Sequence, residues 1–206
     1  MRMIESIYRR DVLAERIWPG AGLWRDVALV MGGALLVALC SRIEVPLRPV
    51  PITAQTFGVL LVGALIGSGR GVLSIFTYLA LGASGFPVFA VGSGNSVISG
   101  GPTAGYLAGF VVAAGVVGRL SERGWDRQTF TTLLAMTLGM LPIYALGAAW
   151  LARFVGWTHA VSVGILPFLV GDALKVALAA LALPQAWAVV GRPETRDGGY
   201  LTRRGP

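Results

Sequence analysis

Hydrophobic and polar positions along this chain form long blocks. Six apolar stretches, separated by short polar gaps, run over residues 27–43, 54–67, 71–83, 103–120, 129–154 and 161–190. A helix needs about 20 apolar residues to cross a bilayer core, with about 17 as the lower limit, and four of the stretches reach that length. The pattern predicts an all-α integral membrane protein, folded as a compact bundle of six transmembrane helices.

The second and third stretches are the short ones, and only Gly67-Ser68-Gly69-Arg70 separates them. They could form one long helix or a hairpin of two short helices. Glycines and an arginine at the centre of a single membrane helix would be costly, whereas Arg70 at a turn can extend its charged end to water. The gap therefore favours a hairpin.

Basic residues are distributed unevenly between the two sides that this topology defines. The N-terminal segment, the second and fourth gaps and the tail together hold 13 of them, while the first, third and fifth gaps hold 3. Because basic residues concentrate on the cytoplasmic side, both termini are expected in the cytoplasm. The predicted parts are an N-terminal cytoplasmic segment (1–24), a six-helix transmembrane domain (25–190) and a basic cytoplasmic tail (191–206).

Composition supports the membrane interpretation. Hydrophobic residues make up 55% of the chain and charged residues 13%, with a mean hydropathy of +0.71. The formal net charge of +7 does not predict nucleic-acid binding, because the basic residues lie at the chain ends and in the gaps and form no continuous face. The single cysteine, Cys40, excludes a disulfide within the chain.

Two charges lie inside the sixth stretch. Asp172 and Lys175 are three residues apart, so they project from one face of a helix. Each charge at the centre of a membrane helix costs about 2.5 to 3.5 kcal/mol even on lenient scales, which marks the pair as a candidate functional site. The alternative is a mutual ion pair that only braces the bundle, although such a pair adds little stability over apolar residues.

The two outer gaps carry the other candidates. Residues 45–55 contain three prolines within six positions, which predicts a stiff, extended segment over the site. Residues 85–95 are uncharged and rich in glycine, as expected of backbone that lines a cavity, and Asn95 offers both a donor and an acceptor. In the first stretch Ala34 and Ala38 form a pair of small residues four apart, suited either to a partner helix or to packing within the bundle.

Catalytic chemistry has little support. The single histidine, His159, has no cluster of Cys, Asp or Glu beside it, and neither a nucleophile with its base nor a phosphate-binding loop is present. We expect no enzyme activity, no metal and no cofactor, so active transport would take its energy from a partner or an ion gradient. An ion-coupled secondary transporter that titrates the charged pair is a rival interpretation.

Four segments together resemble the BioY family, the biotin-specific substrate-binding subunits of energy-coupling-factor (ECF) transporters. They are Val50-Pro51-Ile52-Thr53-Ala54-Gln55-Thr56, Gly85-Phe86-Pro87-Val88-Phe89, Gly101-Pro102-Thr103-Ala104-Gly105-Tyr106, and Gly171-Asp172 with Lys175. The similarity covers about residues 25–190. It implies high-affinity biotin capture and uptake across the cytoplasmic membrane, with biotin held near the outer surface under the first loop; a subunit for another vitamin is the alternative.

The resemblance also implies partners and site residues. A transmembrane coupling subunit (EcfT or BioN type) would meet the first helix at Ala34 and Ala38, and ATPase subunits (EcfA or BioM type) would complete the transporter, with self-association possible.

Ligand contacts carry over to Asn95, Asp172 and Lys175, with Gln55 and Tyr106 as further positions. Asp172 could accept hydrogen bonds from the two ureido N–H groups of biotin, and Lys175 could meet its carboxylate or its carbonyl.

Overall fold

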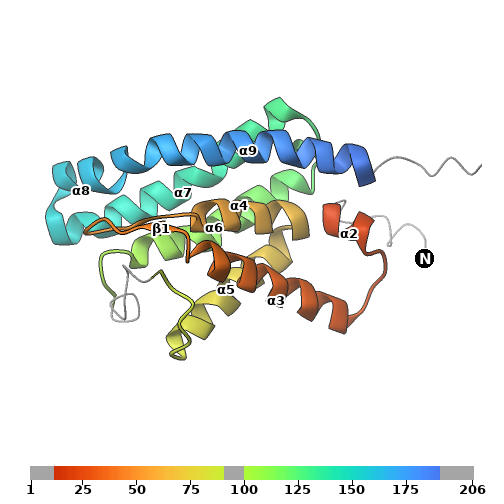
Figure 1. Cartoon of the computed structure of the whole chain (residues 1–206), viewed down its shortest axis with the longest axis horizontal. Coiled ribbons are helices and arrows are strands. Elements are labelled where there is room, and N and C mark those ends of the chain that lie inside the picture. The colour runs from red at the N-terminus through yellow and green to blue at the C-terminus, as the bar shows by residue number, and fades with distance from the viewer. Residues whose placement is uncertain (1–11, 91–99, 191–206) are drawn as a thin grey trace, which may run out of the picture.

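The computed structural model describes residues 12–90 and 100–190 (Figure 1). The long helices are α3 (Leu23–Cys40), α6 (Ala104–Ser121), α7 (Thr129–Val155) and α9 (Leu166–Val190). Shorter ones are α2 (Leu13–Ile17), α4 (Gln55–Ile66), α5 (Ser68–Ala83), η2 (Trp125–Arg127) and α8 (Trp157–Gly164). Strands β1 (Glu44–Val45) and β2 (Ile52–Thr53) complete the described chain.

The helices form a bundle in which each predicted apolar stretch has a counterpart. These counterparts are α3, α4, α5, α6, α7 and α9. By length and apolar character, four segments of the described chain could cross a membrane: α3, α6, α7 and the stretch Trp157–Val190, which contains α8 and α9. The helical membrane fold is thus confirmed, while a crossing by all six helices and the cytoplasmic placement of both termini stay predictions.

The turn between α4 and α5 lies at a single residue. Gly67 has a φ of +84°, a left-handed conformation that favours glycine, and it ends α4 and begins α5. This confirms a hairpin of two helices. The expected turn was longer than the observed one, because Ser68, Gly69 and Arg70 already belong to the first turn of α5.

Helix α4 lies inside the bundle. Most of its side chains are buried, and it packs against α3, α5, α6 and α9. Glycines also allow the backbones of neighbouring helices to approach closely. A Cβ at Gly109 of α6 would lie 2.6 Å from the Cα of Ile143 in α7. A Cβ at Gly118 of α6 would lie 2.4 Å from the backbone nitrogen of Ser68 in α5. Small residues thus set the spacing of the core helices.

Two parts of the fold depart from the expected all-helical pattern. The proline-rich segment forms an antiparallel pair in which Glu44 is opposite Thr53 and Val45 is opposite Ile52, and we call residues 44–53 the β1–β2 hairpin. The last apolar stretch is broken at Ile165, so that α8 and α9 are separate helices. In Figure 1 the β1–β2 hairpin and α8 lie at one end of the bundle and α2 lies at the other.

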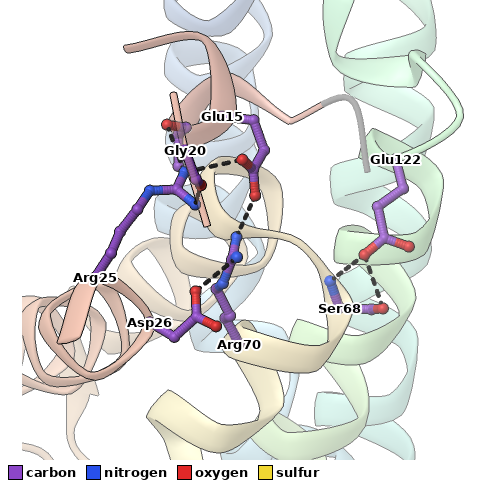
Figure 2. A network of polar contacts seen from close by, with 8 residues as sticks. Glu15, Gly20, Arg25, Asp26, Ser68, Arg70 and Glu122 are labelled. Carbon is purple, nitrogen blue, oxygen red and sulfur yellow. Dashed lines mark hydrogen bonds and ion pairs between the residues drawn. The ribbon is translucent and has the colours of Figure 1, made fainter. Parts of the chain in front are cut away.

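At the end of the bundle that carries α2, a network of charged side chains connects α2 with α3 and α5 (Figure 2). Glu15 of α2 accepts hydrogen bonds from Arg25 of α3 (3.0 Å) and from Arg70 of α5 (2.6 Å). Arg70 also pairs with Asp26 at 2.7 Å, and Arg25 donates to the backbone oxygens of Gly20 and Ala14. The network therefore ties the segment before the first long helix to two neighbouring helices.

Candidate ligand-binding site

A cavity that is partly open to solvent lies at the end of the bundle that carries the β1–β2 hairpin. The hairpin and α4, α6, α7 and α9 contribute to its walls, together with two residues of the loop after α5. Most of the lining is apolar or aromatic: Val50, Pro51, Phe89, Ala90, Leu107, Phe110, Ile143 and Phe168. Polar groups come from Thr53, Gln55, Thr56, Thr103, Tyr106, Tyr144 and Asp172. A mostly apolar cavity with a few polar groups is typical of a small-molecule site.

Asp172 is the charged group in this lining. Its side chain on α9 is almost completely buried, with the whole residue 3% exposed. One carboxylate oxygen accepts from Lys175 Nζ at 2.7 Å and from Thr56 Oγ1 at 3.0 Å, and the other accepts from the Tyr144 hydroxyl. Because three donors from α4, α7 and α9 meet it, the carboxylate is held in one orientation on the cavity wall.

Lys175 lies next to Asp172 but does not line the cavity. Its ammonium group donates to the Thr53 carbonyl oxygen at 2.6 Å, to Thr56 Oγ1 at 3.0 Å and to Asp172 Oδ1 at 2.7 Å. The predicted pair of opposite charges on one helix face is therefore present, and it is also bonded to the β1–β2 hairpin and to the first turn of α4.

Gln55 and Tyr106 both reach the cavity. The Gln55 side chain accepts from Thr53 Oγ1 at 3.0 Å and donates to the Tyr78 hydroxyl. The hydroxyl of Tyr106 donates to the Gly164 carbonyl oxygen at 2.8 Å, and its ring stacks on that of Phe168. Tyr106 lines the cavity, while its hydroxyl is used to hold α8.

One expected residue cannot be placed, and two polar residues were not singled out from the sequence. Asn95 lies outside the described residues. Tyr144 and Thr56 both bond to Asp172. Thr56 ends one of the family-like segments, which was a usable signal, whereas Tyr144 lies in a long apolar stretch where a tyrosine is usually a packing residue.

The two alanines singled out on α3 differ in burial. Ala34 is completely buried within the chain, and a Cβ at the neighbouring Gly33 would lie 2.5 Å from the Ser74 side chain. Ala38 is partly buried against the core. This placement favours packing within the bundle at Ala34, and contact of either alanine with a coupling subunit stays a prediction.

His159 is exposed on α8, and in the described residues no group of three or more His, Cys, Asp or Glu side chains could hold a metal ion. Fold and cavity together define a helical membrane protein with a binding site for a small molecule. The sequence profile of the BioY family matches residues 11–192, so the chain belongs to the BioY family. The match begins at residue 11, and so includes part of the segment that the resemblance was expected to leave out.

Known proteins support this assignment. The "Probable biotin transporter BioY" of Pyrococcus horikoshii is 43% identical over 160 residues, which cover 76% of this chain and 93% of that protein. The "Biotin transporter BioY" of Thermotoga maritima is 41% identical over 148 residues, covering 71% and 86%. The crystal structure of the S-component for biotin from an ECF-type ABC transporter has the same fold, with a TM-score of 0.69, 23% identity and coverage of 81% and 94%.

Proposed function

We propose that this protein captures biotin and delivers it into the cell as the substrate-binding (S) subunit of an ECF transporter. One observation carries the proposal: a buried carboxylate, Asp172, is held in a fixed orientation on the wall of a mostly apolar cavity. Membership of the BioY family supports the same ligand.

The chemistry of biotin fits this lining. Its ureido ring presents two N–H donors, and Asp172 can accept from one of them, because three of the four lone-pair sites of its carboxylate already accept protein donors. Its bicyclic body is apolar and suits the rings of Phe89, Tyr106 and Phe168. Gln55 supplies a further polar group on the wall, and Asn95 is proposed as a contact from sequence alone. A mostly apolar site of this kind penalises ligands that leave its polar groups unpaired, which favours biotin over vitamins that are only similarly apolar.

The proposed assembly follows from the family. The chain would lie in the cytoplasmic membrane with both termini inside, and would associate with a transmembrane coupling subunit of the EcfT or BioN type. ATPase subunits of the EcfA or BioM type would hydrolyse ATP, so this chain would contribute ligand binding and no catalysis.

Binding by the purified protein tests the proposal. The chain is purified in detergent and titrated with biotin by calorimetry, with thiamine and riboflavin as competitors at the same concentrations. We expect saturable biotin binding that neither competitor displaces. Displacement by another vitamin, or a lack of biotin binding by folded protein, would contradict biotin as the ligand.

A second assay addresses the rival transport mechanism. Liposomes containing only this chain are given a proton or sodium gradient, and uptake of labelled biotin is followed. The proposal expects no gradient-driven accumulation in the absence of the partner subunits. Accumulation that collapses with the gradient would identify an ion-coupled secondary transporter instead.

A further inference from the structure

Lys175 has no donor left for a ligand. An ammonium group carries three N–H donors, and within the described residues three acceptors lie 2.6 to 3.0 Å from its nitrogen: the Thr53 carbonyl oxygen, the Thr56 hydroxyl and the Asp172 carboxylate. Each acceptor belongs to the protein. The side chain is also absent from the cavity lining, so it approaches Asp172 from behind the wall.

Two of the three bonds reach other elements, and the third lies within α9. The bond to Thr53 fixes the end of β2 where the chain enters α4, and the bond to Thr56 fixes the first turn of α4. The bond to Asp172 supplies the positive charge that a buried carboxylate needs. Thr56 Oγ1 accepts from Lys175 and donates to Asp172, so the hydroxyl relays between the two charges.

The β1–β2 hairpin also meets the bundle through apolar packing, since Val50 is buried in the hydrophobic core and Ile52 packs against that core. It has two short strands of two residues each, which are marginal on their own in water. Yet Val50, Pro51 and Thr53 of this hairpin line the cavity. A charged hydrogen bond from α9 to the Thr53 carbonyl is therefore well placed to hold the wall closed.

We infer that Lys175 is a positioning residue, which orients Asp172 and anchors the β1–β2 hairpin to α9, and that it does not itself bind the carboxylate of the ligand. This inference rests on the proposed function for the identity of the ligand. The anchoring of the hairpin is independent of any ligand. Loss of Lys175 should open the site and disturb Asp172, and so weaken every ligand of the cavity by a similar factor.

The first test measures the hairpin without ligand. A spin label is attached to a cysteine introduced at the exposed Leu47 in a Cys40→Ala background, and its mobility is recorded by electron paramagnetic resonance. Lys175→Met should increase the mobile component. Leu174→Met is the matched control, because Leu174 is 62% exposed on the adjacent position of the same helix and should leave the spectrum unchanged. An unchanged spectrum in Lys175→Met overturns the inference.

The second test compares two ligands. Dissociation constants for biotin and for its uncharged primary amide are measured on wild type and on Lys175→Met. Loss of a charge-assisted hydrogen bond corresponds to about ten- to a hundredfold in affinity, and both ligands should weaken by the same factor within about threefold. A loss confined to biotin would assign Lys175 to the ligand carboxylate and overturn the inference.

A further variant covers the case in which Lys175→Met does not fold. Asp172→Asn combined with Lys175→Met removes both charges, so no unpaired buried charge remains, yet the Thr53 carbonyl still lacks its donor. The hairpin label should be mobile in this variant as well, and an immobile label would overturn the inference. If wild type binds neither ligand, the proposed function fails, while the label still tests the anchoring.

Discussion

Glu15→Gln tests whether the charged network at the α2 end contributes to stability. The carboxylate accepts from two guanidinium groups, and the arginines differ in burial, with side-chain exposures of 5% for Arg25 and 20% for Arg70. Glutamine keeps an oxygen that can accept a hydrogen bond and removes the charge. Both arginines keep other acceptors, Arg25 in backbone oxygens and Arg70 in Asp26, so neither is stranded.

The magnitude follows from the strength of the two bonds. The two arginines bond to different carboxylate oxygens, so glutamine keeps one acceptor and loses the other bond, and a hydrogen bond to a charged group contributes about 1.5 to 3 kcal/mol. The Glu15 side chain is 27% exposed, which lowers the expected loss in the free energy of unfolding to about 1 to 2 kcal/mol. For a chain of this length that corresponds to about 2 to 8 °C in melting temperature.

The pH dependence of stability provides a second expectation, with a definite direction. Partial burial acts to raise the pKa of Glu15, but the hydrogen bonds and charges of Arg70 and Arg25 outweigh it, so its pKa lies below the ordinary value of 4.5. A carboxyl group with a lowered pKa stabilises the fold above its ordinary pKa, and this contribution is lost as the pH falls through the lowered value. The difference in the free energy of unfolding between wild type and Glu15→Gln should be largest at neutral pH and should shrink below about pH 4.5.

Thermal unfolding in detergent, followed by circular dichroism, measures both expectations. Arg123→Gln is the control, because it also changes the net charge by one but alters an exposed side chain. Its melting temperature should stay within about 1 °C of wild type, as for most surface substitutions. Equal melting temperatures for wild type and Glu15→Gln at neutral pH, or a difference that grows on acidification, would refute the reasoning.

Three other predictions concern binding, packing and topology. Asp172→Asn should weaken biotin about ten- to a hundredfold in calorimetry on folded protein; an unchanged affinity would remove Asp172 from the site. Gly118→Ala should cost about 1 to 3 kcal/mol of stability, because its Cβ would lie 2.4 Å from a backbone nitrogen of α5, whereas Gly32→Ala, with no atom within 4 Å, should not destabilise the fold. In a Cys40→Ala background, cysteines at Phe86 and Arg123 should react with an impermeant thiol reagent from outside and from inside respectively; labelling of position 123 in intact cells would refute the topology.

Sequence patterns predicted the helices where a local signal marked their ends. Gly67 lies at the turn of the α4–α5 hairpin because the backbone there has a positive φ, and its position between two apolar stretches made that turn predictable. The break between α8 and α9 was not predicted, although Gly164 and Pro167 flank it in the sequence and glycine and proline are common at helix ends and helix starts respectively. It coincides with a tertiary contact: Tyr106 donates to the Gly164 carbonyl oxygen, and a Cβ at Gly164 would lie 2.4 Å from the same hydroxyl.

Helix α3 shows a second case in which the spacing of residues in the sequence does not predict which of them are buried. Ala34 and Ala38 are four residues apart, as are Ala28 and Gly32, so a rule based on small residues selects either pair. Only the folded chain distinguishes them: Ala34 is fully buried, whereas Gly32 is exposed with no atom within 4 Å of an added Cβ. Which small residues are available to a partner depends on the packing of α4 and α5, and this packing is not encoded within α3.

The charged pair illustrates why a site can be located from sequence while the roles of its residues cannot. Two charges in an apolar stretch are expensive, so Asp172 and Lys175 stood out as soon as the stretch was recognised. The role of each residue depends on groups far away in the sequence, because Thr53, Thr56 and Tyr144 form the remaining hydrogen bonds with the pair. These bonds satisfy the carboxylate and attach the hairpin at the same time. Orientation of the charged wall and closure of the cavity are therefore coupled, and a ligand that strengthens one is expected to strengthen the other.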